Sequence, residues 1–291
     1  MVTPSYNQGR FIERTIDSVL SQQFPGNLEY LVMDGGSHDG TREILSRYGG
    51  KLQWVSEHDG GQADAVNKGL GRATGDIIGW LNSDDIYYPG AIAAVCEIFG
   101  AHPEADVVYG DANHIDASDG ILEPYPTEAW DFNRLLETCF LCQPAVFFRK
   151  SVVERFGTLD ASLQMCLDYE YWIRLTKSGA VFHWLRQVLA GSRLYPETKT
   201  LGARVRVHGE INGMLARRIG RVPDRWLYNY AHAVVDGKGI PRSSRRLFPL
   251  MVSGISIYAG LRWNHRISID MQKTTGAWVA GAIARVFRVE V

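Results

Sequence analysis

The chain has little cysteine, and what it has does not suggest disulfides. Its 291 residues contain Cys96, Cys139, Cys142 and Cys166, too few and too irregularly spaced for a disulfide framework. Cys139 and Cys142 form a CxxC pair, but neither a second cysteine pair nor a histidine pair completes a zinc site. We therefore expect buried thiols and a reducing compartment.

Long apolar runs are also missing. The longest uncharged stretch, Leu247 to Leu261, has 15 residues, whereas a helix that spans a bilayer needs about 20. No signal peptide opens the chain, which begins inside its first predicted strand, so we expect that strand to be incomplete. The predicted location is the cytoplasm, either free or peripheral on the inner face of the plasma membrane.

Net charge is almost absent, but the formal value of −1 conceals two opposite parts. Residues 1–200 carry 16 Lys+Arg and 27 Asp+Glu, a net charge of −11, and residues 201–291 carry 15 and 5, a net charge of +10. This asymmetry predicts an acidic body at 1–200 and a basic, mainly helical segment at 201–291 that prefers anionic surfaces. No basic-aromatic nucleic-acid module is recognisable, so nucleic acid is not an expected partner.

The first part alternates short apolar runs with helical patterns, as βαβ units do. This rhythm predicts an α/β fold with a Rossmann-like, mostly parallel sheet flanked by helices. Strands are predicted at 1–3, 28–34, 52–57, 76–81, 105–111 and 144–149, and helices at 10–24, 41–48, 60–73, 89–99 and 166–179. After about residue 200 the strand signals fade and helical patterns remain, which predicts a helical C-terminal appendage.

Acidic residues follow three of the predicted strands. Asp34 ends the second strand, Glu57 and Asp59 follow the third, and Asp84 and Asp85 follow the fourth. Open α/β sheets bind ligands at the carboxyl ends of their strands, so we expect these groups to converge on one crevice. Adjacent carboxylates repel each other and a divalent cation offsets that repulsion, although a solvated turn would also suit these residue types.

Five motifs, in this order and spacing, together give a stronger family signal than any one of them alone. They are "TPSYNQ", "DGGSHDGT", "EHDGGQADAVNKG", "WLNSDD" and "LDYEYWIRL". With them, roughly residues 1–200 resemble an inverting family-2 glycosyltransferase of the GT-A fold, of the bacterial surface-polysaccharide type. The basic segment lies outside the resemblance.

The resemblance implies a role for particular residues. Nucleotide-sugar contacts fall to Thr3, Pro4, Ser5, Tyr6, Asn7, Asp34, Asp59, Gln62, Asn67, Asn82, Ser83, Arg193 and Lys199. Asp34 would accept a hydrogen bond from the base, and Arg193 and Lys199 would clamp the diphosphate unless they are surface charges.

The metal and the catalytic base are also implied. Asp84 and Asp85 would hold Mn²⁺ or Mg²⁺, because hard oxygen ligands suit these ions. Asp168 falls on the position of the catalytic base at the start of a helix, a place that also suits an N-cap. Gln143 and Trp172 are expected on the acceptor side.

Two positions depart from the family pattern. Asn82 replaces the first Asp of the DxD motif, although an amide oxygen can still ligate a metal. Tyr195 stands where many relatives carry a histidine near the metal, so the sequence does not supply a histidine ligand there.

The predicted function is metal-dependent, inverting sugar transfer. The donor would be a UDP-, dTDP- or GDP-sugar, and the acceptor a hydroxyl of a glycan or of a polyprenyl-linked glycan. A sugar-1-phosphate nucleotidyltransferase is an alternative, but "VTPSYNQGRF" lacks the glycine- and lysine-rich phosphate loop expected of one. A non-catalytic nucleotide-sugar-binding protein is a second alternative, and retention of Asp84, Asp85 and Asp168 argues against it.

The basic segment has two interpretations. Its arginines flank stretches rich in Trp, Tyr, Leu and Ile, as in amphipathic helices that lie in the interface of an anionic membrane. The alternative is a helical subdomain that packs on the body or forms a homo-oligomer contact.

Overall fold

The computed structural model describes residues 1–196, 198 and 202–284. They fall into two compact units. Unit 1 comprises Met1–Leu135 and Cys139–Tyr195, and unit 2 comprises Leu136–Thr138 with the described residues from Pro196 onward. Lys199, one of the predicted diphosphate contacts, lies outside the described residues.

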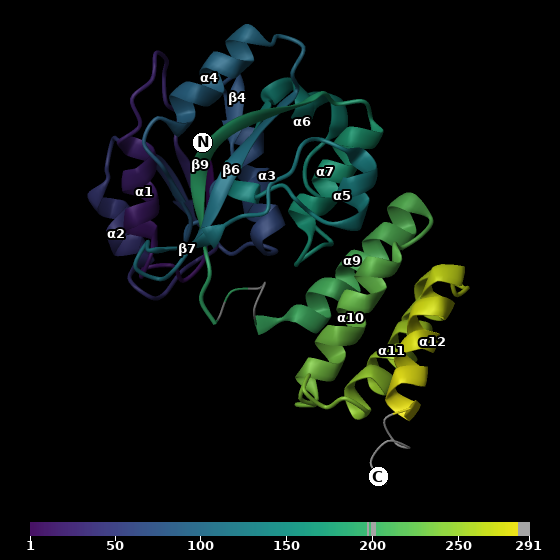
Figure 1. Ribbon diagram of the computed structural model, residues 1–291. Coiled ribbons are helices and arrows are strands. Elements are labelled where there is room, and N and C mark those ends of the chain that lie inside the picture. The colour runs from purple at the N-terminus through teal and green to yellow at the C-terminus, as the bar shows by residue number, and fades with distance from the viewer. Residues whose placement is uncertain (197, 199–201, 285–291) are drawn as a thin grey trace. The chain divides into compact units, whose positions relative to one another are not determined.

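Unit 1 contains a three-stranded parallel sheet in the order β1-β2-β3 (Figure 1). Its strands are β1 (Val2–Ser5), β2 (Leu31–Asp34) and β3 (Gln53–Ser56). The register pairs Ser5 with Asp34 and Asp34 with Ser56, so three polar residues form a row at the carboxyl ends of the strands. The predicted first strand is present and extends to Ser5, beyond the expected end at Thr3.

A second sheet has the order β4-β8-β6-β9-β5, with β7 paired to β6. Its strands are β4 (Ile77–Gly79), β5 (Ile86–Tyr87), β6 (Val107–Ile115), β7 (Ile121–Pro124), β8 (Val146–Arg149) and β9 (Phe182–Arg193). β6 and β9 are parallel, whereas β8 is antiparallel to both β4 and β6. The α/β class is confirmed, and the structure adds that this sheet is mixed.

The two sheets meet beside β1. Trp80 forms a parallel bridge with Val2, and the Leu81 amide donates to the Val2 carbonyl at 3.0 Å. The chain therefore builds β1, β2 and β3 outward in one direction and then returns to the other side of β1. Such a reversal of strand order is a topological switch point, the place where α/β sheets bind ligands.

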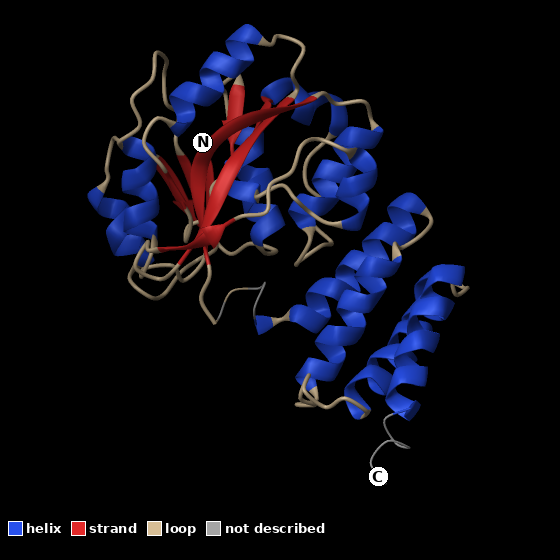
Figure 2. Cartoon of the chain, viewed as in Figure 1, coloured by secondary structure: helices blue, strands red, loops and turns tan. Residues whose placement is uncertain are grey.

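Helices flank the sheets of unit 1 (Figure 2). They are α1 (Ile12–Leu20), α2 (Thr41–Arg47), α3 (Gln62–Arg72), α4 (Ala91–Ala101), α6 (Lys150–Phe156) and α7 (Leu167–Lys177), with a 3₁₀ turn η1 (Gln143–Ala145). A further helix, α5 (Phe132–Glu137), begins in unit 1 and ends in unit 2. α1 buries Ile12, Ile16 and Val19, the spacing of an amphipathic helix. α3 packs closely on β1 because Gly69 has no side chain, and a Cβ there would lie 2.4 Å from Val2 Cγ1.

Unit 2 is helical, as expected for the C-terminal appendage. It contains α9 (Arg204–Ile219), α10 (Asp224–Gly237), α11 (Leu247–Asn264) and α12 (Ile269–Ala284), each packed on the next (Figure 1). α10 and α11 share a small core of Ala231, Val235, Phe248 and Val252. Among the described residues, no helix combines the length and the apolar character that crossing a membrane requires.

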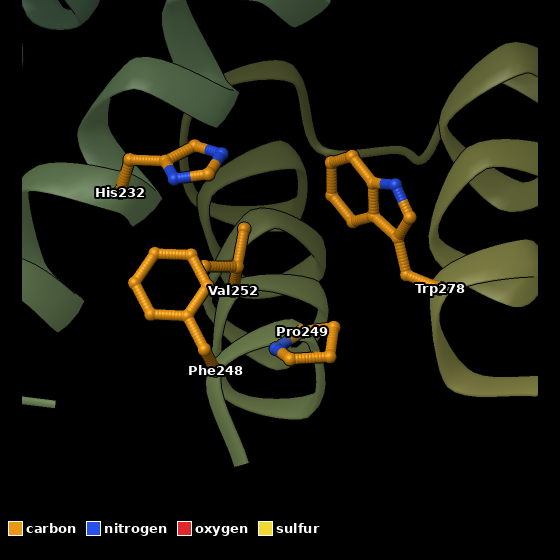
Figure 3. A pocket seen from close by; sticks show the side chains of 5 residues that line it. All are labelled: His232, Phe248, Pro249, Val252 and Trp278. Carbon is orange, nitrogen blue, oxygen red and sulfur yellow. The ribbon is translucent and has the colours of Figure 1, made fainter. Parts of the chain in front are cut away.

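A pocket of about 200 Å³ lies within unit 2 (Figure 3). His232 from α10 and Trp278 from α12 face Phe248, Pro249 and Val252 of α11 across it. The walls are apolar and aromatic, so the pocket belongs to the packing of these helices.

The cysteines carry free thiols. Cys142 and Cys166 are buried, whereas Cys96 and Cys139 are half-buried, so the expectation of buried thiols is met by two of the four. Burial raises the pKa of the thiols of Cys96, Cys139 and Cys142, which keeps them protonated.

The close contact between β6 and β9 makes one glycine critical. A Cβ at Gly110 would lie 2.4 Å from Leu189 Cδ1 and 2.9 Å from the Gln187 carbonyl oxygen. Gly110→Ala should therefore lower the free energy of unfolding by about 1–3 kcal/mol, measured by urea denaturation. Gly71→Ala is the matched control, because α3 has open space there and alanine should stabilise the helix by about 0.5–1 kcal/mol. Equal stability of both variants would contradict the close packing of these strands.

Candidate functional site

The loops at the carboxyl ends of β1 and β2 are tied together. The Gly35 amide donates to the Ser5 carbonyl at 2.8 Å, and the Asn7 amide donates to Ser37 Oγ at 2.7 Å. The Asn7 side chain in turn accepts from the His38 amide at 3.0 Å. These bonds hold Asn7 in a left-handed conformation with φ of 53° and leave Tyr6 exposed at the rim. The first loop of the predicted nucleotide pocket is thus a fixed surface.

Asp34 lies at the centre of this edge and is almost fully buried. Its carboxylate accepts hydrogen bonds from Ser37 Oγ at 2.5 Å, Ser56 Oγ at 2.6 Å and the Ser37 amide at 3.0 Å. The Gly36 amide adds a fourth at 3.2 Å. Asp34 therefore joins the ends of β2 and β3, and its predicted contact with a nucleotide base stays a prediction.

The end of β3 continues into the first turn of α3. Asp59 accepts from the Gly61 amide at 2.8 Å and lies against Gly35, where a Cβ would be 2.8 Å from Asp59 Oδ2. Gln62 then donates from Nε2 to Asn82 Oδ1 at 2.7 Å. The ends of β2, β3 and β4 are therefore linked through short contacts, and the convergence of the acidic groups on one crevice stays a prediction.

Asn82 is the hub of a network of neutral side chains. Its Oδ1 accepts from Gln62 and from Trp80 Nε1 at 3.0 Å, and its Nδ2 donates to Gln143 Oε1 at 2.8 Å and to Asp85 Oδ2 at 3.3 Å. Gln143 also donates to the Trp80 carbonyl at 2.6 Å. With two donors on its oxygen, Asn82 orients its neighbours, and its nucleotide-sugar contact stays a prediction.

The two carboxylates after Ser83 sit in different surroundings. Asp85 is 4% exposed, and burial, with the neighbouring charge of Asp84 next, raises the pKa of its carboxyl well above the usual value. Asp84 is half-buried and accepts from Tyr195 Oη at 2.8 Å. The Thr15 hydroxyl lies 2.9 Å from the Ser83 carbonyl and 2.8 Å from the Asp85 carbonyl. α1 thereby fixes the backbone that carries both acids.

Arg193 supports this loop from inside. Its amide donates to Asp85 Oδ1 at 2.8 Å, its Nε donates to the Asp84 carbonyl at 2.6 Å, and its Nη2 pairs with Asp119 at 2.5 Å. The side chain is 0% exposed. The expectation of a diphosphate clamp does not fit this placement, because the guanidinium has no surface open to a ligand.

The carboxylate oxygens of Asp84 and Asp85 are ligands of the kind that a hard divalent cation prefers. No group of three or more His, Cys, Asp or Glu side chains gathers in the part of the chain that the structure describes. Asp84 and Asp85 supply two carboxylates, and Mg²⁺ is commonly held by one or two carboxylates together with substrate phosphates. Tyr195 points its hydroxyl at Asp84, so the neighbour of this carboxylate is a phenol and not an imidazole.

Asp168 lies in the first turn of α7 and is half-buried. Burial, followed by the charge of Asp168, raises the pKa of the Cys139 thiol. The pKa of the Cys142 thiol is raised by burial first, then by Asp85, and also by Asp168. The charges of Asp85 and Asp168 therefore both act on the Cys142 thiol.

Three other residues predicted for the site have side chains that pack against or hydrogen-bond to other parts of unit 1. Trp172 is completely buried against Phe148 and Tyr171, so it offers no acceptor-side surface. Thr3 is buried in β1, with Oγ1 3.1 Å from Tyr30 Oη, and does not line a pocket with its side chain. Asn67 makes paired bonds of 2.9 Å with the backbone of Leu159, which anchors α3 to that loop.

The sequence did not reveal the supporting residues. Thr15 lies inside the predicted helix at 10–24 and Asp119 lies in a turn, and neither belongs to one of the five motifs. Their roles depend on long-range contacts, such as Arg14 and Arg193 meeting at Asp119. The one local signal was a polar Thr15 among the buried positions of α1.

Known proteins resemble the chain most clearly in its first part. A family model described as glycosyl transferase family 2 matches residues 1–157. An uncharacterised glycosyltransferase of Rickettsia typhi is 30% identical over 213 residues, which are 69% of this chain and 65% of that protein. A PGL/p-HBAD biosynthesis glycosyltransferase of Mycobacterium bovis is 28% identical over 200 residues, 66% of this chain and 75% of its own. The chain thus spans just under two thirds of the length of the Rickettsia relative.

Solved structures share the fold. TarS residues 1–349 from S. aureus, in complex with UDP-GlcNAc, has a TM-score of 0.63 and 15% identity, covering 99% of this chain and 90% of that one. The mannosyltransferase PcManGT of Pyrobaculum calidifontis, in complex with GDP-Man and Mn²⁺, has a TM-score of 0.60 and 20% identity, covering 99% and 81%. These similarities confirm the GT-A-type fold that the sequence predicted.

The Asn82 network yields a test. In Asn82→Asp, an oxygen replaces the Nδ2 that donates to Gln143 and Asp85, which adds a third carboxylate and leaves acceptors facing acceptors. The free energy of unfolding should fall by about 1–3 kcal/mol in metal-free buffer, measured by urea denaturation. The same change at the exposed Asn133 should have little effect. An equally small effect at Asn82 would show that its amide is not needed as a donor.

Proposed function

Because the chain belongs to glycosyl transferase family 2, we propose that it transfers a sugar from a nucleotide-diphosphate sugar to a hydroxyl group of a glycan or lipid-linked acceptor. The pair of carboxylates at the switch point carries this proposal. Asp84 and Asp85 follow β4 directly beside the β1 loop, where the fold would receive a diphosphate.

The donor is proposed to carry uridine, thymidine or guanosine diphosphate. Neighbours in fold are described in complex with UDP-GlcNAc, UDP or GDP-Man, which supports this class of donor. In this chain the exposed Tyr6 and Asn7 with the half-buried Asp59 and Gln62 would face the nucleotide. Arg193 and Trp172 are left out because both are buried, and Lys199 lies outside the described residues.

Asp84 would be the principal metal ligand and Asp85 a second, more buried one. Mn²⁺ or Mg²⁺, when bound, would neutralise the negative charge that grows on the departing diphosphate. The chain orients Asp84 for this task through Tyr195 Oη and through Arg193, which holds the Asp84 carbonyl. Asn82 and the Arg193 amide hold Asp85.

Asp168 is proposed as the general base. Its place in the first turn of α7 would let the carboxylate take the proton of the acceptor hydroxyl while that oxygen attacks the anomeric carbon. The bond to the diphosphate oxygen would break on the opposite face, so the product would have inverted anomeric configuration. One carboxylate suffices for this single displacement.

The proposed setting is the cytoplasm, with the acceptor carried on a polyprenyl diphosphate at the inner face of the plasma membrane. The +10 charge of residues 201–291 supports a membrane surface as partner. Incubation with a panel of nucleotide sugars and Mn²⁺, with detection of released nucleotide, tests the donor class. Conversion of a nucleotide sugar and added pyrophosphate to nucleoside triphosphate and sugar 1-phosphate would instead support nucleotidyl transfer, and no turnover with any acceptor would leave only binding.

Removal of Asp84 tests the metal site. Asp84→Ala should abolish metal-dependent binding of a nucleoside diphosphate, because the half-buried carboxylate at the strand end is the proposed ligand. Isothermal titration calorimetry with Mn²⁺ measures this, and circular dichroism should show an intact fold. Asp270→Ala, at an exposed acid of unit 2, is the matched control. Affinity equal to that of the parent protein would remove Asp84 from the site.

Substitution of Asp168 separates chemistry from binding. Asp168→Asn keeps the shape of the side chain but cannot take a proton, so transfer should fall by roughly 10²–10⁴ while donor affinity persists. Rates with donor and acceptor, and calorimetry with donor alone, measure the two effects. Asp270→Asn should leave both unchanged. Retained anomeric configuration in the product, seen by NMR, would rule out the single displacement.

A further inference from the structure

α11 of unit 2 carries an exposed apolar stripe. Leu247, Leu250, Tyr258 and Leu261 are 40–52% exposed, so the described residues leave about half of each uncovered. At about 100° per residue, these four positions and the exposed Gly254 fall within an arc of roughly 80° on the helix. We call these five residues the α11 stripe. Single exposed leucines are ordinary, but an aligned row on one helix marks a contact surface.

The stripe is distinct from the core of unit 2. Phe248 and Val252 point to the opposite side of α11, where they meet His232 and Trp278 around the apolar pocket (Figure 3). α11 is therefore apolar on both sides, but only the side with Phe248 and Val252 is buried by the described residues. A helix that is apolar all round needs a second apolar environment for its outer face.

Cations bound the stripe at both ends. Arg245 and Arg246 precede α11, Arg262 and Arg266 follow Leu261, and all four are exposed. From residue 237 to residue 269 the sequence has six Lys+Arg and neither Asp nor Glu. An apolar row between clusters of arginine complements a surface with an apolar interior and anionic groups at its rim.

These charges distinguish between two possible partners of the α11 stripe, a second copy of the chain and an anionic membrane. If a second copy packed its stripe on this one in antiparallel fashion, Arg245 and Arg246 would face Arg262 and Arg266 of the other copy. A parallel pair would set each cluster against its own equivalent. Both arrangements bring like charges together, which disfavours self-association. Anionic phospholipids instead offer phosphates to the arginines and acyl chains to the leucines.

We infer that the α11 stripe docks in the plane of an anionic phospholipid membrane. Leu247, Leu250 and Leu261 enter the boundary between headgroups and acyl chains. Tyr258 sits at headgroup depth with its ring buried, and its hydroxyl accepts a hydrogen bond from Arg262 Nη1 at 3.0 Å. The arginines at both ends bind lipid phosphates. Docking at this surface does not depend on sugar transfer, so the two can be tested separately.

The test uses the full chain and vesicles without donor or acceptor. Co-sedimentation with vesicles of phosphatidylcholine and phosphatidylglycerol should show binding at low salt that weakens at high salt, because the Debye length shrinks from about 10 Å at 0.1 M to about 3 Å at 1 M. Vesicles of phosphatidylcholine alone should bind far less. No binding to the anionic vesicles at low salt would overturn the inference.

Two pairs of variants locate the surface. Leu250→Glu with Leu261→Glu should lower the partition coefficient at least roughly tenfold, because two apolar contacts are lost and two anions gained. Ile121→Glu with Leu122→Glu makes the same change in charge on exposed residues of unit 1, 63% and 55% exposed, and should have a much smaller effect. Equal losses in both would show that charge alone governs binding.

The arginines provide a milder comparison that keeps the stripe intact. Arg245→Gln with Arg246→Gln should weaken vesicle binding more than Arg217→Gln with Arg218→Gln, a matched pair of exposed arginines at the end of α9. Equal weakening would contradict a local surface at α11. Light scattering of the parent protein without lipid completes the test: a dimer that Leu250→Glu with Leu261→Glu converts to monomers would assign the stripe to self-association and overturn membrane docking.

Discussion

The structure around the switch point depends on keeping two adjacent carboxylates close together, one of them almost fully buried. Asp85 lies beneath the surface next to Asp84, and burial and the Asp84 charge both raise the pKa of its carboxyl. The Asn82 side-chain amide and the Arg193 backbone amide both donate hydrogen bonds to Asp85. The Arg193 side chain turns instead to backbone carbonyls and Asp119. The two amides on Asp85 and the Tyr195 hydroxyl on Asp84 are uncharged donors, and this arrangement is compatible with a cation that arrives with a ligand.

The amide at position 82 follows from the same constraint. A carboxylate there would add a third negative charge and remove the hydrogen that Asn82 gives to Asp85 and Gln143. The amide also receives hydrogen bonds from Trp80 and Gln62, so one side chain fixes the end of β4 and the start of α3. Its difference from the family pattern is therefore compatible with an ordered site, because it exchanges a potential ligand for a positioning group.

Local patterns predicted β1 to β4, β6 and β8 but missed β5, β7 and the long β9, and they did not predict which strands pair. The strand at 144–149 was expected from its apolar run, yet its antiparallel position between β4 and β6 depends on long-range pairing. The acidic strand ends could be predicted to converge because parallel strands share an edge. The burial of Arg193 and Trp172 could not, since exposure depends on what covers a residue. A motif gives the position of a residue in the sequence, whereas tertiary packing determines whether its side chain is exposed.

The same limit applies to unit 2. The sequence predicted a basic helical segment, because charge and helical period are local properties. It could not predict which side of α11 is exposed. Apolar residues occur all round this helix, so its hydrophobic pattern does not single out one face. Packing against α10 and α12 removes that ambiguity by covering Phe248 and Val252 and leaving Leu250 and Leu261 outward. Charge alone would draw this segment to any polyanion, and the exposed apolar row is what narrows the choice to a surface with an apolar interior.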